Sequence, residues 1–94
     1  MTDCELAYVE VEQGHFEEFK HTSIFQYFII EGSGTFFLDD EAVPVTEGDL
    51  VQIKPGTRIW YKGKMRMTLV TEPAWTQEGE THIRTISQEE MDNA

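Results

Sequence analysis

Residues 27–59 read YFIIEGSGTFFLDDEAVPVTEGDLVQIKPGTRI, and this stretch decides the fold. Short apolar runs rich in Phe, Ile, Val and Thr alternate in it with clusters of turn-forming residues. The clusters are Gly32-Ser33-Gly34, Asp39-Asp40, Glu47-Gly48-Asp49 and Lys54-Pro55-Gly56. Runs of about 5 to 8 residues with such regular punctuation are typical of a closed or two-layered antiparallel sheet, not of helices.

The flanking sequence continues the pattern of short strands. Residues 6–12 alternate apolar residues with glutamates, which predicts an early strand with one solvent-facing side. Residues 16–20 are ambiguous and predict a loop or a short strand. Residues 24–31 are apolar on both faces except at Gln26, which predicts a central strand covered on both sides.

Turn chemistry sets the expected connections. Gly32-Ser33-Gly34 predicts a turn between two strands, Asp39-Asp40 a hairpin tip, and Gly63-Lys64 a two-residue connection. Residues 82–86 predict a last short strand. Ser87 and Glu90 have the spacing of a capping box, which predicts a short C-terminal helical turn.

Length and composition indicate one small globular domain. The 94 residues form a single domain, with a barrel core expected at about 5–75 and a C-terminal tail at 76–94. Six Phe, three Tyr and two Trp provide enough bulk to fill a small barrel. A chain of this size also gains core by sharing it with a second copy, so a homodimer is expected.

Charge and targeting signals limit the function classes. Eighteen acidic against seven basic residues give a net charge of −11, which argues against nucleic-acid and membrane-surface partners. The single Cys4 excludes an intramolecular disulfide. No basic region precedes an apolar run at the N-terminus, and no stretch approaches the roughly 18 apolar residues of a membrane span. A cytoplasmic location is the expectation.

The spacing of the turn residues resembles that of the small single-domain cupins. Residues 31–34 (Glu-Gly-Ser-Gly), 48–49 (Gly-Asp) and 55–57 (Pro-Gly-Thr) fall at the intervals of the two cupin sequence blocks, which cover about half of the chain. The resemblance implies an all-β fold: a cupin-type double-stranded β-helix, or jelly-roll barrel, with a short C-terminal turn. It also favours a homodimer paired through the sheets.

The same resemblance places four metal-ligand positions at Phe19, His21, Phe25 and Ile59. Only His21 keeps a side chain that can bind a metal ion. A metal site of three histidines and one carboxylate needs imidazole and carboxylate donors, which phenylalanine and isoleucine lack. The sequence therefore predicts no metal and no other cofactor.

Strand alternation extends these inward positions into a predicted cavity. If Phe25 points inward, the two-residue period turns Tyr27 and Ile29 inward as well, and the same count from Ile59 turns Tyr61 inward. The full predicted set is His21, Phe25, Tyr27, Ile29, Ile59, Tyr61, Met67 and Trp75. The two phenols form either a small polar site or a pair of hydrogen-bonded core residues.

The remaining polar residues have simpler expectations. His21 either points into the cavity or is a hydrogen-bonded loop histidine. His15 and His82 lie in polar, break-rich segments and are expected at the surface. Lys54 and Arg58, beside the Pro-Gly turn, either hold an anion at the barrel mouth or are solubilising charges.

The sequence therefore predicts a cupin barrel without the family metal, which binds a small, largely apolar or aromatic molecule. One alternative is a cupin enzyme, either a metal-dependent dioxygenase or a sugar isomerase or epimerase. It would use His21 with ligands not located in the sequence, or Tyr27, Tyr61 and His21 as a metal-free acid and base. Another is an assembly subunit in which exposed Phe16, Phe19 or Trp75 docks on a second protein.

Overall fold

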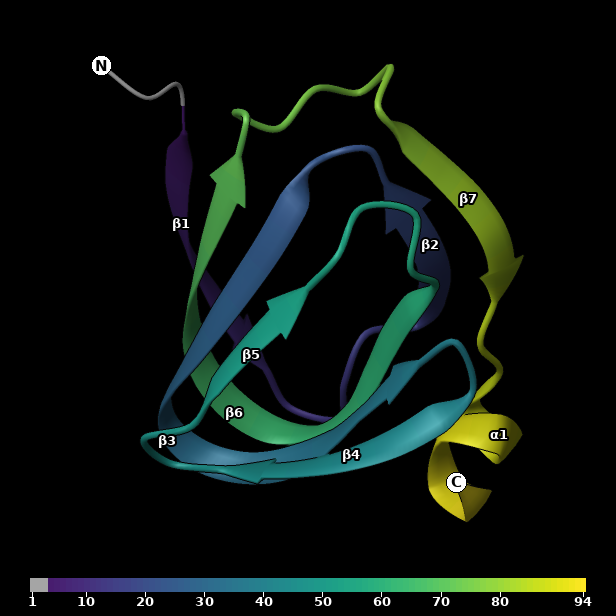
Figure 1. Cartoon of the computed structure of the whole chain (residues 1–94). Coiled ribbons are helices and arrows are strands. Elements are labelled where there is room, and N and C mark those ends of the chain that lie inside the picture. The colour runs from purple at the N-terminus through teal and green to yellow at the C-terminus, as the bar shows by residue number, and fades with distance from the viewer. Residues whose placement is uncertain (1–3) are drawn as a thin grey trace.

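A computed structural model describes residues 4–94 as a sheet of seven strands with one short helix. The strands are β1 (Glu5–Val11), β2 (Glu17–His21), β3 (Ile24–Leu38), β4 (Glu41–Thr46), β5 (Leu50–Ile53), β6 (Ile59–Glu72) and β7 (Glu80–Thr85), followed by α1 (Gln88–Asn93) (Figure 1). Within residues 4–94, no helix has the length and apolar character needed to cross a membrane.

The long strands β3 and β6 pair antiparallel along most of their length, and every other strand except β7 attaches to one of them. The first half of β3 also pairs with β5 and the second half with β4. β6 pairs with β1 through its second half and with β2 at its first residue, and β7 pairs with β2. The sheet thus folds over on itself without closing, which confirms the jelly-roll cupin architecture.

Two expected connections are strand interiors instead. Gly32-Ser33-Gly34 lies inside β3 and Gly63-Lys64 inside β6, so the prediction of turns there is wrong. A bulge between Ile29 and Glu31 and positive φ values at Gly32 (+93°) and Gly63 (+135°) let both strands bend sharply without ending. Gly34 lies opposite Gly63, and the two backbones approach closely because neither carries a side chain.

The tip between β3 and β4 has the predicted hairpin chemistry. Asp39 and Asp40 both have positive φ, at 51° and 72°. Two consecutive positive φ values are typical of the tight turns that match the twist of a hairpin. The side chain of Asp39 also accepts a hydrogen bond from the backbone N–H of Arg58 at 2.9 Å, which ties the tip to the start of β6.

The main core lies on the concave side of the folded sheet. Its buried members are Phe19, Phe25, Tyr27, Ile29, Phe36, Val45, Val51, Ile53, Ile59, Tyr61, Met65 and Met67. The alternating burial along β3 confirms that Phe25, Tyr27 and Ile29 point inward. Burial of Ile59 and Tyr61 confirms the same for β6.

A smaller cluster covers part of the convex side. Trp60 of β6 packs with Ile86 and with Met91 of α1, and Phe16 and Phe37 pack against this group. The Ser87 side chain caps α1 by accepting a hydrogen bond from the Glu90 N–H, as the sequence predicted. Figure 1 shows α1 beside the curved wall of strands rather than within it.

These two clusters bury two of the three aromatic residues that were expected to dock on a second protein. Phe19 is buried in the main core and Phe16 is partly buried against the outer cluster, so neither is available as an exposed anchor. Of the three aromatic residues proposed for docking, only Trp75 is exposed.

The outer face of β3 near its start is not covered, contrary to the prediction from residues 24–31. Ile24, Phe28 and Ile30 are 39%, 43% and 36% exposed. The outer cluster around Trp60 covers part of the other half of the wall, whereas these three side chains remain exposed. Leu6 and Tyr8 of β1 and Leu50 of β5 are exposed on the same sheet half.

The close approach of Gly34 and Gly63 predicts the effect of adding one methyl group. In Gly63→Ala the new Cβ would press on Gly34 Cα and on the Ser33 carbonyl, and the residue would also be held at φ +135°. We expect a loss of about 3 kcal/mol or more in the free energy of unfolding, measured by urea denaturation. Gly48→Ala is the control, because Gly48 has φ +91° but open space around it, and it should cost about 1 kcal/mol.

Candidate functional site

A continuous series of aromatic rings runs from the rim of the barrel to its interior. In order it contains Trp75, His21, Phe25, Phe19, His15, Tyr61, Tyr27 and Phe36. Neighbouring ring centroids are 5.0 to 6.1 Å apart, as in ordinary aromatic pairs. The side chains able to exchange protons are therefore embedded in an apolar, aromatic surrounding.

Tyr27 and Tyr61 form the inner end of this series. Their ring centroids are 5.6 Å apart with an edge-on arrangement, and the residues are only 2% and 3% exposed. Burial raises the pKa of Tyr27 well above its usual value, and the neighbouring Tyr61 raises it further. Burial likewise raises the pKa of Tyr61 to about 12, although the interaction with Tyr27 partly offsets this. Both phenols therefore keep their protons at neutral pH and can donate them.

His15 lies directly on Tyr61. Its ring stacks on the Tyr61 ring at 5.4 Å and meets Phe19 edge-on at 5.3 Å, while its backbone N–H donates to the Tyr61 carbonyl at 2.8 Å. Its ring Nδ1 lies 2.7 Å from the Glu17 carbonyl oxygen. Because a carbonyl only accepts, Nδ1 carries the hydrogen, and in the neutral ring the lone pair is on Nε2. His15 is thus arranged as a proton acceptor.

The surface position expected for His15 is wrong, because the residue is half-buried. Gly14 forms a bridge with Lys62 of β6, and this bridge carries the segment between β1 and β2 across the wall. The conformation needs Gly14, whose φ is +139°. His82, by contrast, is exposed as expected and pairs with Glu17 at 3.4 Å.

His21 is buried at the rim and uses both ring nitrogens for structure. Nδ1 accepts a hydrogen bond from the Ser23 N–H at 2.9 Å, so Nε2 carries the hydrogen and donates to the Thr76 carbonyl at 2.9 Å. The backbone carbonyl of His21 also accepts a hydrogen bond from the Gly56 N–H. Of the two expectations for His21, the hydrogen-bonded loop histidine is the one that the structure supports.

The residues at the metal-ligand positions of the cupins do not fit a metal. Phe19, Phe25 and Ile59 are buried in the barrel interior and offer no donor atom, and both nitrogens of His21 are occupied. Within residues 4–94, no three His, Cys, Asp or Glu side chains come together as a metal-binding group. The polar side chains that meet in the aromatic series are instead the phenols of Tyr27 and Tyr61 and the imidazole of His15.

The other predicted cavity residues occupy two environments. Ile29 and Met67 are completely buried in the core, as an inward-facing wall requires. Trp75 is 39% exposed and stacks on His21 at the rim. Its indole N–H donates to Glu80 at 3.2 Å. A depression of about 370 Å³ lies beside His21 at this rim, lined also by Lys20, Thr22, Pro55, Gly56, Gly79 and Thr81.

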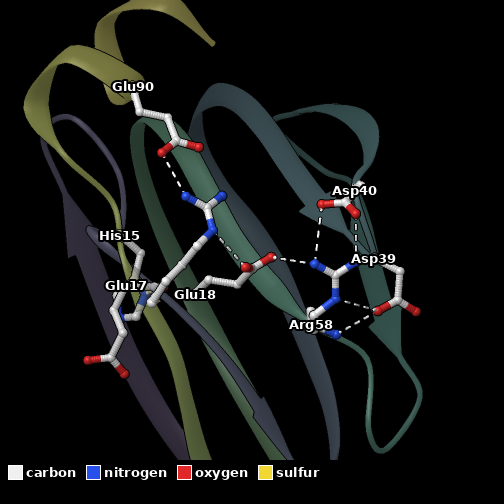
Figure 2. Close-up of polar contacts among 8 residues, drawn as sticks. His15, Glu17, Glu18, Asp39, Asp40, Arg58 and Glu90 are labelled. Carbon is white, nitrogen blue, oxygen red and sulfur yellow. Dashed lines mark hydrogen bonds and ion pairs between the residues drawn. The ribbon is translucent and has the colours of Figure 1, made fainter.

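Arg58 is not a free anion site. Its guanidinium pairs with Asp40 at 2.6 Å and with Glu18 at 3.5 Å (Figure 2). These carboxylates already satisfy the positive charge that the sequence suggested for holding an anion. Lys54 is exposed at the Pro-Gly turn.

The raised pKa values of the two phenols predict how stability depends on pH. The phenol of Tyr61 ionises near pH 12 in the fold but near 10.0 when exposed, so its contribution to stability is complete below pH 10 and is lost as the pH rises towards 12. The loss corresponds to about 3 kcal/mol from this residue. Urea midpoints measured at pH 9 and pH 11.5 should fall less in Tyr61→Phe than in the wild type. Equal falls in both proteins would contradict the burial argument.

Comparison with known proteins gives one strong similarity. No family model and no curated protein matches the chain. The solved structure of Pac13, described as a unique nucleoside dehydratase, is 41% identical with a TM-score of 0.93, and the match covers 96% of this chain and 76% of Pac13. Streptomyces Pac13 was also solved with uridine after a histidine was replaced by glutamine, at 40% identity and TM-score 0.93, with coverage of 96% and 76%. Two further variants with uridine have a tyrosine replaced by phenylalanine.

More distant structures share the fold alone. A cupin protein from Bacteroides fragilis is 18% identical with a TM-score of 0.71, covering 77% of this chain and 67% of its own. Oxalate decarboxylase from Bacillus subtilis is 16% identical with a TM-score of 0.79, covering 87% and 24%. The architecture common to these structures and the identity with Pac13 along nearly the whole chain lead to one conclusion: the protein belongs to the cupin family, as a relative of Pac13.

Proposed function

We propose that the protein is a lyase that removes water from a nucleoside, with His15, Tyr27 and Tyr61 as its reacting side chains. The observation that carries the proposal is the meeting of one imidazole and two phenols inside an apolar barrel. The three groups complement each other, because the neutral imidazole of His15 carries its lone pair on Nε2 while both phenols are held protonated.

The replaced residues of Pac13 support the same three positions. The two tyrosines replaced in Pac13 lie 34 positions apart in that chain, the same separation as Tyr27 and Tyr61. The replaced histidine precedes the first of those tyrosines by 13 positions, and His15 precedes Tyr27 by 12. A one-residue difference is small for a segment that contains a loop between β2 and β3.

Dehydration needs a base that removes a proton from one carbon and an acid that protonates the hydroxyl group on the neighbouring carbon. Nε2 of His15 would take the proton from a sugar carbon, and a phenol of Tyr61 or Tyr27 would give a proton to the hydroxyl on the neighbouring carbon. The C–H and C–O bonds break, a carbon–carbon double bond forms, and water leaves. Imidazole is a weak base, so the carbon proton must be made acidic by an adjacent carbonyl group. The expected substrates are nucleosides with an oxidised sugar carbon.

Access to the phenols requires movement of packed side chains. Tyr27 and Tyr61 are covered, whereas His15 is half-buried and Trp75 is exposed at the rim. Phe25 contacts both His21 and Tyr27, at ring-centroid distances of 5.3 and 6.2 Å, so its ring separates the depression beside His21 from the phenols. The competing possibility is a protein that binds a small molecule without transforming it, which the apolar lining also permits. The following experiment distinguishes an enzyme from such a binding protein.

Substitution of each reacting residue should separate chemistry from binding. We expect His15→Gln, Tyr27→Phe and Tyr61→Phe to lower kcat for dehydration at least a hundredfold, because each removes a proton-transfer group. Uridine binding, measured by calorimetry, should persist in all three, because their shapes change little. Product formation is followed by mass spectrometry as loss of one water.

The chain provides a matched control for each substitution. Tyr8→Phe and His82→Gln alter exposed residues of the same types and should leave kcat unchanged. Uridine binding with no dehydration of any oxidised nucleoside by the wild type would favour the binding protein. Failure to bind uridine at millimolar concentration would contradict the nucleoside assignment altogether.

We also propose that the protein forms a homodimer. The exposed residues Leu6, Tyr8, Ile24, Phe28, Ile30 and Leu50 lie on the outer face of one sheet half, formed by β1, β3, β5 and the second half of β6. Exposed apolar side chains that gather on one face of a sheet often mark a site of protein–protein contact. A second copy using the same face would cover it with a symmetric interface.

Light scattering tests this part of the proposal. At micromolar concentration we expect a mass of twice 10.9 kDa, and the monomer mass for Phe28→Glu, because a charge at the centre of the face prevents its burial. Ile83→Glu places the same charge at an exposed apolar position of β7, outside the face, and should stay dimeric. A monomeric wild type would rule out the dimer.

A further inference from the structure

A chain of charges of alternating sign lies outside the barrel wall, with Glu18 at its centre (Figure 2). Glu18 Oε1 accepts a hydrogen bond from Arg84 Nε at 2.9 Å, and Oε2 lies 3.5 Å from Arg58 Nη1. Arg84 also donates to Glu90 of α1 at 2.7 Å, and Arg58 donates to Asp40 of the hairpin tip at 2.6 Å. One carboxylate of β2 is thus connected, directly or through an arginine, to the residue that precedes β6, to β7, to α1 and to the tip between β3 and β4.

Glu18 is more deeply buried than the arginines with which it pairs in this chain of charges. It is only 1% exposed, whereas the side chains of Arg58 and Arg84 are 35% and 39% exposed. Its Oε2 has no hydrogen-bond partner within residues 4–94. Removing a carboxylate from water is costly, and an apolar residue of similar volume often serves a purely structural position as well or better. A role beyond covering the wall is therefore worth seeking.

The position of Glu18 in β2 shows what the charges hold. β2 pairs with β6 at one position only, between Phe19 and Ile59. On its other side, its pairing with β7 is interrupted by a register shift between Glu18 and Phe19. The contacts of Glu18 with Arg58, just before β6, and with Arg84 of β7 therefore reach to both sides of β2 at the place where its register with β7 shifts.

This point of the backbone also orients His15. The carbonyl that accepts the hydrogen bond from His15 Nδ1 belongs to Glu17. That carbonyl and the backbone nitrogen of Glu18 lie in one rigid peptide plane. A side chain that restrains the Cα of Glu18 therefore restrains one end of the peptide plane that holds the Glu17 carbonyl.

We infer that Glu18 is a positioning residue: held between Arg58 and Arg84, it fixes the Glu17–Glu18 peptide and through it the orientation and tautomer of His15. With Nδ1–H held on the Glu17 carbonyl, the Nε2 lone pair stays available as the base. The consequence for catalysis rests on the proposed function, whereas the consequence for the His15 tautomer does not.

Nitrogen NMR of the His15 ring in Glu18→Gln tests the inference. Glutamine keeps the shape and one acceptor oxygen but lacks the charge that holds two arginines. We expect a single Nδ1–H tautomer in the wild type and a mixture of tautomers in the variant. For an oxidised nucleoside we expect kcat to fall about tenfold or more, as for other residues that orient a reacting histidine, with the Kd for uridine unchanged.

Glu31→Gln is the matched control, since it removes the same charge from an exposed carboxylate paired with Arg66 at 3.6 Å. It should leave both the tautomer and kcat as in the wild type. An unchanged tautomer in folded Glu18→Gln would overturn the inference. If circular dichroism shows that this variant does not fold, Glu18→Gln combined with Arg84→Gln, which removes one charge of each sign, is judged by the same criterion.

The two proposals fail in different ways. A wild-type protein with the Nδ1–H tautomer but no activity on any nucleoside contradicts the lyase assignment and leaves the role of Glu18 standing. A loss of activity in Glu18→Gln without any change of the His15 tautomer contradicts the role of Glu18 and leaves the lyase assignment standing.

Discussion

The pairing of β3 with β6 is the constraint on which the rest of the structure depends. Both strands bend at glycines, so each belongs to two sheet halves that face each other across the core. Tyr27 lies in the half where β3 pairs with β5, and Tyr61 lies in the half where β6 pairs with the end of β3. The bend therefore brings two phenols that are distant along the chain to a centroid separation of 5.6 Å. A bulky residue at Gly34 or Gly63 would force β3 and β6 apart at the bend. Tyr27 and Tyr61 would then no longer be held together.

The same burial that stabilises the barrel also decides its chemistry. An apolar surrounding disfavours the phenolate, so both tyrosines stay protonated near neutral pH. An imidazole in the same surrounding needs an external group to set its tautomer, and the Glu17 carbonyl is that group for His15. Within residues 4–94, the main core is thus built from apolar and aromatic side chains, two of which carry a phenol. Phe25 and Ile59 extend this apolar lining over positions where other cupins hold metal ligands.

Sequence periodicity predicted the parts of the fold and site that depend on local pattern. Alternation along β3 and β6 placed Phe25, Tyr27 and Tyr61 inward, because a strand has only two faces. Gly32, Gly34 and Gly63 predict turns but lie within strands, because the backbone freedom that ends a strand also lets a long strand bend. His15 could not be placed from sequence, because its position follows from the Gly14–Lys62 bridge and the Tyr61 carbonyl, which are contacts between distant segments. An apolar run in the sequence also does not indicate whether the outer face of its strand packs against the same chain or against a second copy.

β2 shows how one short strand can contact both the aromatic core and the charged residues outside the wall. Phe19 enters the aromatic core, while Glu18, its neighbour, faces the arginines on the outside of the wall. A regular strand alternates its faces in this way, but here a register shift falls between the two residues and loosens the backbone pairing. Ion pairs with groups on both sides can replace the missing backbone contacts, because they act across the bulge and their direction is fixed by the planar guanidinium groups. An apolar side chain at position 18 could fill the same volume, but dispersion contacts have no direction and would not hold the peptide plane. The placement of charge outside the wall is therefore what allows the interior to remain apolar and still keep a histidine in one orientation.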